Sequence, residues 1–395
     1  MSLIRNSPFG TLTILLVLLG AVSIGSWVFF FESEGEKLGI RPVQIDSGAY
    51  HSCSLFSDHT IYCWGRNGNG QLGDKTFEGA LVPKPVSGIS SAGAVSAGGF
   101  HTCAVLLSGK IRCWGTNDSG QVGHGPFGGS SHSKEVGQVA DAVAVTAGTR
   151  HTCALISDGT VRCWGGNQKG QLGIGTAPET SSVPVAVPLV NKAKTITAGG
   201  FHTCVLLKGG SIACWGGNEA GQLGRGAFKK SGGPWLVSGI EDAVAVAAGG
   251  GHTCAVLSDG SVRCWGENND GQLGTELFGN SSGPLRVPGL VNAVGVTSGA
   301  FHSCALLKDG HLKCWGRGVN GQLGFSGADP AKAPVTVPGI SSAMSVTAGA
   351  FHTCALDLLG KIECWGTNDS GQLGIGEPKG HAPARGVVAF GFGRV

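Results

Sequence analysis

The side chains best suited to chemistry in this chain are cysteines and histidines, and both recur at fixed spacing. Seven copies of one phrase each contain a cysteine pair with nine residues between its members, and a histidine two residues before the first cysteine. The first cysteines are Cys53, Cys103, Cys153, Cys204, Cys254, Cys304 and Cys354. Their partners are Cys63, Cys113, Cys163, Cys214, Cys264, Cys314 and Cys364. The histidines are His51, His101, His151, His202, His252, His302 and His352.

Two kinds of chemistry fit such a cluster, a metal site or a disulfide. Zinc takes four N, S or O ligands, whereas one repeat supplies only three and lacks the short spacing of structural zinc modules. All 14 cysteines fall into the seven pairs. We therefore predict seven disulfides and no metal or other cofactor, with each histidine ring bonding backbone within its hairpin.

The local sequence also predicts which cysteines pair. Between Cys153 and Cys163, the stretch 157–159 is Ser-Asp-Gly, and its glycine suits the left-handed position of a three-residue hairpin loop. Counting outward from this loop places Leu155 opposite Val161 and then the two cysteines opposite each other. Each disulfide within a hairpin would then stabilise its unit by roughly 2–3 kcal/mol.

The period of these pairs, 50 or 51 residues, indicates a repeat architecture. In the fifth copy, short apolar strands are expected at Ala243–Ala247, His252–Leu257, Ser261–Trp265 and near Leu285–Val287. No segment has helical periodicity, so about four strands per unit predict an all-β, seven-bladed propeller. The tryptophan after each second cysteine repeats without change, which is more typical of blade packing than of a functional site.

The ends of the repeat region suggest how the ring closes. The first copy begins at Pro42 without the preceding strand that the other copies receive, and the last copy runs on past Gly374. We expect the strand Val387–Phe390 to complete the blade that the N-terminal strand begins, which would remove an open sheet edge. The propeller is thus predicted to span residues 37–395.

Residues 1–36 form a separate N-terminal segment. Leu12–Phe31 is a run of 20 uncharged, mostly apolar residues, long enough to cross a bilayer. Arg5 before the run and Glu32 after it orient an anchor with residues 37–395 outside the cytoplasm. A signal peptide cleaved after Ser23 is the alternative. Either segment predicts an extracytoplasmic protein, in a periplasm or at the cell surface, where disulfides persist.

The repeated phrases A-G-x-x-H-T-C-A-L, D-G-x-V-x-C-W-G and N-x-x-G-Q-L-G resemble the regulator of chromosome condensation repeat, over residues 40–395. The resemblance implies a seven-bladed propeller, but members of this family have different functions, including guanine-nucleotide exchange, light sensing and inhibition of β-lactamases. The cysteine pairs resemble those of exported bacterial members. An exchange factor is the less favoured reading, because an apolar segment stands where a basic tail would be expected.

A functional site is expected where the copies differ. The residue before each repeated histidine varies, and closure of the ring would place these positions around one mouth of the central channel. They are Tyr50, Phe100, Arg150, Phe201, Gly251, Phe301 and Phe351. Aromatic residues and arginine are enriched in protein interfaces, so we predict binding of a protein here. Filling of the space between blades is the alternative.

A second variable set follows each Cys-Trp-Gly and includes Arg66 and Arg317, which suit the polar rim of an interface or a solvated loop. The chain has no common catalytic motif, and a formal net charge of +3 offers no strong field for nucleic acid. We therefore expect a monomeric, non-enzymatic, protein-binding propeller. A structural protein of the cell envelope is the main alternative, and an exchange-factor-like regulator or an enzyme is less favoured.

Overall fold

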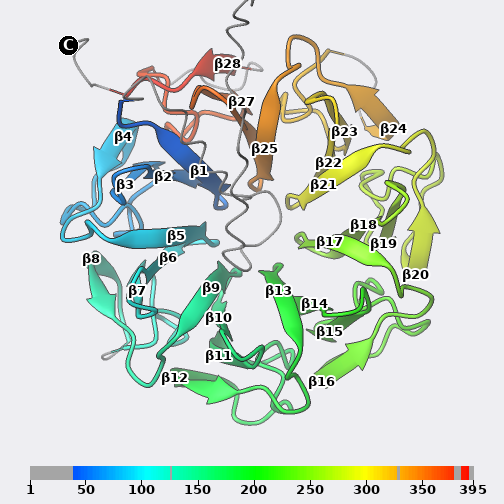
Figure 1. Ribbon diagram of the computed structural model, residues 1–395, viewed down its shortest axis with the longest axis horizontal. Helices are drawn as coiled ribbons and strands as arrows, with labels where there is room; N and C mark the ends of the chain where they lie inside the picture. Colours follow the sequence, from blue (N-terminus) through cyan, green and yellow to red (C-terminus); the bar gives the residue numbers. More distant parts are fainter. Residues whose placement is uncertain (1–38, 125–126, 327–329, 378–383, 391–395) are drawn as a thin grey trace, which may run out of the picture.

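A computed structural model of the chain describes residues 39–124, 127–326, 330–377 and 384–390. The predicted apolar segment Leu12–Phe31 lies outside these residues. Within the described part, every regular element is a β-strand, and no helix capable of spanning a membrane is found. Seven four-stranded antiparallel sheets surround a central axis, which confirms the predicted seven-bladed propeller (Figure 1).

Each blade contains four consecutive strands in the order of the sequence. The innermost strands are β1 (Pro42–Ser47), β5 (Ala92–Ala97), β9 (Ala142–Ala147), β13 (Ala193–Ala198), β17 (Ala243–Ala248), β21 (Ala293–Ser298) and β25 (Ala343–Ala348). The second strands are β2 (His51–Phe56), β6 (His101–Leu106), β10 (His151–Ile156), β14 (His202–Leu207), β18 (His252–Leu257), β22 (His302–Leu307) and β26 (His352–Asp357).

The outer half of each blade is a hairpin partner followed by an edge strand. The third strands are β3 (Ile61–Gly65), β7 (Ile111–Gly115), β11 (Val161–Gly166), β15 (Ile212–Gly216), β19 (Val262–Gly266), β23 (Leu312–Gly316) and β27 (Ile362–Gly366). The edge strands are β4 (Ala80–Pro85), β8 (Ser130–Glu135), β12 (Thr180–Ala186), β16 (Ser231–Leu236), β20 (Ser281–Arg286), β24 (Ala331–Thr336) and β28 (Ala384–Val387). Proline within β12, β16, β20 and β24 discourages further pairing at these edges.

The predicted hairpin register is confirmed. Leu155 pairs with Val161 and Cys153 with Cys163, and Gly159 has a φ of 85° as the three-residue turn requires. In all seven blades the two cysteines face each other with Cα atoms 4.1 Å apart and are bonded as disulfides. The pairing is local because turn length and strand register alone fix it.

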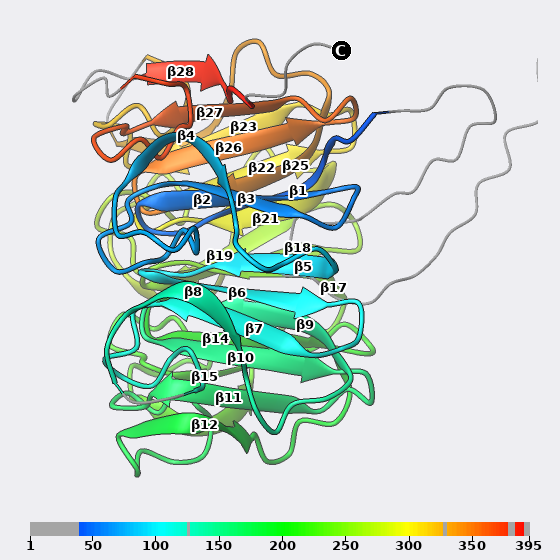
Figure 2. The ribbon, with the colours of Figure 1, turned by 90° about the vertical axis from the view of Figure 1, so that its left-hand side faces the viewer.

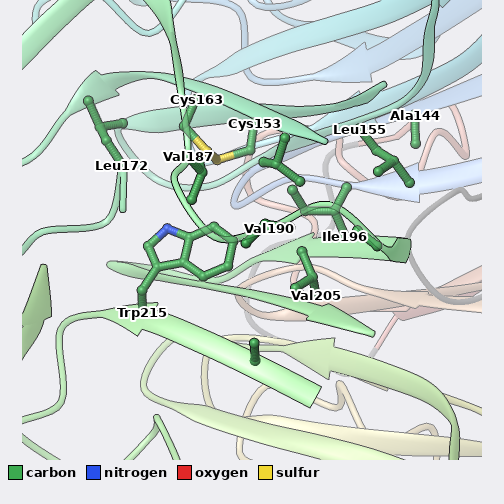
Figure 3. Close-up of a cluster of buried hydrophobic side chains, with 13 residues drawn as sticks. Ala144, Cys153, Leu155, Cys163, Leu172, Val187, Val190, Ile196, Val205 and Trp215 are labelled. Carbon is green, nitrogen blue, oxygen red and sulfur yellow. A yellow bond between two sulfur atoms is a disulfide. The ribbon is translucent and has the colours of Figure 1, made fainter. Parts of the chain in front are cut away.

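The hydrophobic core is divided among the junctions between blades. Figure 3 shows one junction, in which the Trp215 indole of the fourth blade packs beside the Cys153–Cys163 disulfide, Leu155 and Leu172 of the third. The equivalent tryptophan is at most 1% exposed in every blade. The repeated tryptophans therefore serve in packing, as predicted, and the structure shows that they join one blade to the next.

The predicted mode of ring closure is wrong. The C-terminal strand β28 spans Ala384–Val387 and pairs with β27, so it completes the seventh blade and not the first. The first blade consists of β1 to β4 and is already complete. Contacts between the seventh and first blades close the ring: Phe390 lies against Phe56, with ring centroids 5.0 Å apart, and against Trp64 at 6.0 Å, and the Gly376 amide donates to the Leu81 carbonyl at 3.0 Å.

Candidate functional site at the channel mouth

Tight backbone contacts hold the loops at one end of the channel. These loops join the first strand of each blade to the second, and neighbouring loops bond directly to each other. The Ala49 amide donates to the Gly98 carbonyl at 3.1 Å, and the Gly99 amide donates to the Gly148 carbonyl at 3.0 Å. A Cβ atom on Gly48 would lie 2.3 Å from the Gly98 carbonyl oxygen, so glycine is required there. The rim of the channel is consequently rigid and close-packed.

The seven variable positions before the histidines lie on this rim, and we call them the mouth ring: Tyr50, Phe100, Arg150, Phe201, Gly251, Phe301 and Phe351. Because strands alternate in direction within a blade, the second variable set, which follows each third strand, lies on the same face as the mouth ring. The backbone brings the two variable sets together, because the amide of Arg66 donates to the Tyr50 carbonyl at 2.9 Å and that of Arg317 to the Phe301 carbonyl at 3.0 Å. The same bond recurs in all seven blades.

Four mouth-ring residues form a continuous aromatic arc across the sixth, seventh, first and second blades. Ring centroids are 5.6 Å apart for Phe301 and Phe351, 6.0 Å for Phe351 and Tyr50, and 6.0 Å for Tyr50 and Phe100. All four side chains are half-buried. They pack against each other at the surface and retain exposed area for a further contact.

The two predicted arginines lie on this aromatic arc. The Arg66 guanidinium is 5.7 Å from the Tyr50 centroid and 5.6 Å from that of Phe100, and the Arg317 guanidinium is 5.4 Å from that of Phe301. Attraction between a cation and an aromatic face holds the planar guanidinium in place. Arg317 also lies 3.9 Å from the Asp270 carboxylate. Both arginines therefore add oriented hydrogen-bond donors to the aromatic surface.

The other half of the mouth ring is different. Arg150 is exposed, and Phe201 has 41% of its surface exposed. A Cβ on Gly251 would lie 2.5 Å from a Glu267 carboxylate oxygen, so that side chain occupies the place of an aromatic ring. The mouth ring is thus asymmetric, with a stacked aromatic arc on one side and separate charged or exposed groups on the other.

Below the mouth ring, the ends of the innermost strands enclose a cavity of about 90 Å³. Its wall consists of alanine, serine and threonine from all seven blades together with one carboxylate, Asp46. The Asp46 carboxylate accepts bonds from the Ala97 amide at 2.9 Å and the Thr347 hydroxyl at 3.1 Å. Burial raises the pKa of Asp46 to about 6.

The repeated histidines have a different partner from the one predicted. Each ring donates from Nε2 to a hydroxyl of the next blade, as in His202 to Thr253 at 2.9 Å, and not to backbone of its own hairpin. That hydroxyl donates to the Gln222 carbonyl, which also accepts the Trp265 indole N–H. Because the hydroxyl has one proton and gives it to the carbonyl, Nε2 must carry the histidine proton.

We call this His–Thr/Ser–Gln–Trp network the latch layer. It links all seven junctions, including His352 of the last blade to Ser52 of the first at 2.9 Å. Burial lowers the pKa of the seven histidines to about 3 or 4, with neighbouring histidines adding to the effect in five of them. The rings are therefore neutral at pH 7. Among the described residues, no three His, Cys, Asp or Glu side chains are grouped as a metal site requires.

One exposed aromatic set on the mouth face was missed. Phe77, Phe127, Phe228 and Phe278 are each exposed by more than half, in the long loops after the third strands. All four follow the last glycine of the N-x-x-G-Q-L-G phrase, or its variant in the second blade, by four residues. This constant offset was available in the sequence, but the varied loop sequences around it obscured the pattern.

Comparisons with known proteins agree with this geometry. A family model described as RCC1-like domain matches residues 94–387. Two models described as the Regulator of chromosome condensation (RCC1) repeat match residues 58–105 and 43–71. The comparison with curated proteins gives no match.

Solved structures share the fold at low sequence identity. Prp20p of Saccharomyces cerevisiae is 24% identical, with a TM-score of 0.73 over 84% of this chain and 86% of that chain. Human WBSCR16 is 21% identical, with a TM-score of 0.75 over 84% of this chain and 95% of that chain. The CRINKLY WD40 ectodomain of the Arabidopsis thaliana receptor kinase ACR4 is 20% identical, with a TM-score of 0.50 over 83% and 98%.

Proposed function

The chain belongs to the RCC1-like family of seven-bladed propellers, and from this premise we propose that it is an exported, membrane-anchored scaffold that binds a protein partner through the mouth ring. RCC1-like propellers commonly mediate protein binding and are typically non-enzymatic. The structure of Prp20p was described with its binding to Gsp1p and histones, and yeast Prp20 was also solved bound to Kap60. Those partners belong to Prp20, and only the general role is carried over.

The observation that carries the proposal is the aromatic arc with its two stacked arginines. Half-buried aromatic rings and oriented guanidinium groups are the residues that contribute most energy in protein interfaces. They lie on loops that bond to each other from blade to blade, so little conformational freedom remains to be lost on binding. A rigid face of this composition suits a folded protein better than a small molecule.

Export is supported by the seven disulfides, which persist in oxidising compartments. The apolar run Leu12–Phe31 supplies the signal and, in our proposal, remains as the anchor. Cell fractionation of the full chain tests this directly. We expect it in the membrane fraction with its original N-terminus. A soluble chain with a new N-terminus near Ser23 would instead establish a cleaved signal peptide.

Binding is tested by capture of partners from an envelope extract with the full chain solubilised in mild detergent. The informative variant carries Phe201→Ala and Phe301→Ala, one substitution on each half of the mouth ring. The matched control is Leu189→Ala, because Leu189 is an exposed apolar residue on the opposite face, 91% exposed. We expect the double variant to lose partners that the wild type and the control retain. If a folded double variant keeps every specific partner, the mouth ring is not the binding site.

A further inference from the structure

The two ends of the described chain lie on the same face of the propeller. Gly39–Arg41 precedes β1, and β1 runs from that face toward the mouth ring. The last strand, β28, runs away from the mouth ring and ends on the same face. In the side view, the dark-blue start of β1 lies at the right-hand face and the red β28 arrow points toward it (Figure 2). We call this the turn face, since it carries the turns between second and third strands.

An exposed apolar patch surrounds the point where the chain enters β1. Ile40 is 61% exposed, and in the neighbouring turn of the seventh blade Leu358 is 54% and Leu359 is 82% exposed. The two segments are in contact, because the Arg41 guanidinium donates to the Leu358 carbonyl at 2.7 Å. We name Ile40, Leu358 and Leu359 the N-terminal patch.

Folding of the turn does not require these leucines. The equivalent two positions are Ser157-Asp158 in the third blade and Ser258-Asp259 in the fifth. In the seventh blade the Asp357 carboxylate supplies the turn's bonds instead, accepting from the Leu359 amide at 2.9 Å and the Lys361 amide at 2.8 Å. Two adjacent leucines are thus exposed at a turn that contacts the incoming chain; the turn of the first blade contacts it as well, because Ser57 and Arg41 bond to each other.

We propose that the N-terminal patch rests on the surface of the lipid bilayer in which Leu12–Phe31 is anchored. The inference depends on the anchoring part of the proposed function and not on protein binding. Seven residues lie between Phe31 and Gly39, so the eight steps from one to the other span at most about 28 Å when fully extended. The anchor therefore holds the patch close to the membrane. At the high effective concentration that a short tether produces, even a small apolar contact is populated.

The charged groups beside the patch balance one another. Arg41, Lys361 and Arg385 are offset by the carboxylates Asp58, Asp357 and Glu363, so attraction to lipid is assigned to the apolar side chains. Leucine side chains insert at the boundary between headgroups and acyl chains. Docked in this way, the propeller directs its mouth ring away from the membrane, toward a partner in the surrounding compartment.

The test uses the full chain in phosphatidylcholine and phosphatidylglycerol vesicles that contain a doxyl-labelled lipid as a quencher. All 14 native cysteines are paired, so a single Lys361→Cys substitution provides one thiol for a fluorophore beside the patch. Phe201→Cys provides the same probe on the mouth face. We expect the doxyl lipid to quench the probe at position 361 at least about twofold more strongly than the probe at position 201.

A second variant separates docking from mere closeness to the anchor. Leu358→Ser with Leu359→Asp gives this turn the residues of the third and fifth blades, so the fold should be retained. We expect quenching at position 361 to fall by about half. Unchanged quenching would show that the tether alone brings the probe near lipid and would overturn the proposal. The probe at position 361 could also become more protected from solvent in detergent, without lipid, as the protein concentration rises. That result would show that a second copy of the chain covers the patch, and it would also overturn the proposal.

The outcome for the proposed function remains separate. A chain that is released from the membrane by cleavage near Ser23 overturns the patch proposal, because no tether then exists. The capture experiment with the mouth-ring variant would still test protein binding in that case. If the probes at positions 361 and 201 are quenched equally while partner capture is normal, only the proposal for the patch is overturned.

Discussion

The latch layer and the mouth ring contain neighbouring residues of the sequence but follow opposite rules. In the latch layer the histidine is identical in all seven blades, its hydroxyl partner is Thr or Ser, and the bond lengths are nearly constant, 2.8 to 2.9 Å between histidine and hydroxyl. One residue earlier, the mouth ring contains tyrosine, phenylalanine, arginine or glycine. The difference shows that two adjacent residues have separate roles. The buried histidine holds neighbouring blades together, and the mouth-ring residue before it is free to vary.

Acid provides the strongest test of the latch layer. The folded-state pKa values of the seven histidines lie at about 3 or 4, below the ordinary 6.5, so their stabilisation is complete above pH 6.5 and is lost as pH falls toward 4. One pKa unit corresponds to about 1.4 kcal/mol, so seven sites together can remove an ordinary stability of roughly 5–15 kcal/mol. Thermal melts between pH 7 and 4 should show a steep fall.

Carboxylates provide the control for this acid test. The side-chain hydroxyl and the backbone amide of Thr160 donate hydrogen bonds to the Asp158 carboxylate and lower its pKa. Stabilisation from this carboxylate is therefore lost only as the pH falls below 3.8, the ordinary pKa of aspartate. A loss between pH 6.5 and 4.5 is therefore assigned to histidine. If stability stays flat down to pH 4.5, the latch histidines do not limit folding.

A single break in the latch layer should have the next largest effect. Trp215→Ala removes an indole with 0% exposure and its bond to the Gln171 carbonyl, so we expect a loss of about 3–5 kcal/mol. Denaturant unfolding measures it. Trp235→Ala is the matched control, since Trp235 is 56% exposed on an edge strand, and should cost well under half as much. Equal losses would contradict the assigned role of the buried tryptophans.

The mouth ring should show the reverse pattern. Phe201→Ala with Phe301→Ala should weaken partner binding at least about a hundredfold, because central interface aromatics each contribute about 2 kcal/mol or more. The same variant should change the free energy of unfolding by no more than about 1 kcal/mol, since neither ring is fully buried. Calorimetric titration and denaturant unfolding of one preparation give both values. A large loss of stability would show that these two rings support the fold rather than a binding surface.

A substitution of Asp46, in the cavity below the mouth ring, should have the smallest effect on stability. Its pKa is raised to about 6, so its stabilising contribution is complete below pH 3.8 and is lost as pH rises through 6. Asp46→Thr introduces the residue found at this position in four other blades. We expect the variant to be more stable than the wild type at pH 8, by on the order of 1 kcal/mol, with the difference becoming smaller as the pH falls through 6. A wild type that is more stable at pH 8 would contradict this.

The sequence predicts structure well where the interacting residues are close together in the chain and poorly where they are far apart. Strands β17, β18 and β19 begin and end within a residue of their predicted limits, because turn and strand patterns are local. Strand β20 spans Ser281–Arg286, several residues earlier than expected, since the Gly-rich loop before it carries no pattern. For the candidate site, the sequence identified the variable positions but not the stacking of Arg66 on Tyr50 and Phe100, which needs two adjacent blades.

The sequence by itself determined the number of blades, the seven disulfides and the residues that vary among the copies. Each of these follows from a period or from a register within about ten residues. Only the tertiary structure decided the histidine partners, the placement of β28 in the seventh blade and the contact between Arg41 and the Leu358 turn. These contacts join residues that are about 20 to 320 positions apart, and identical repeats cannot show which neighbour a side chain meets until the ring has closed.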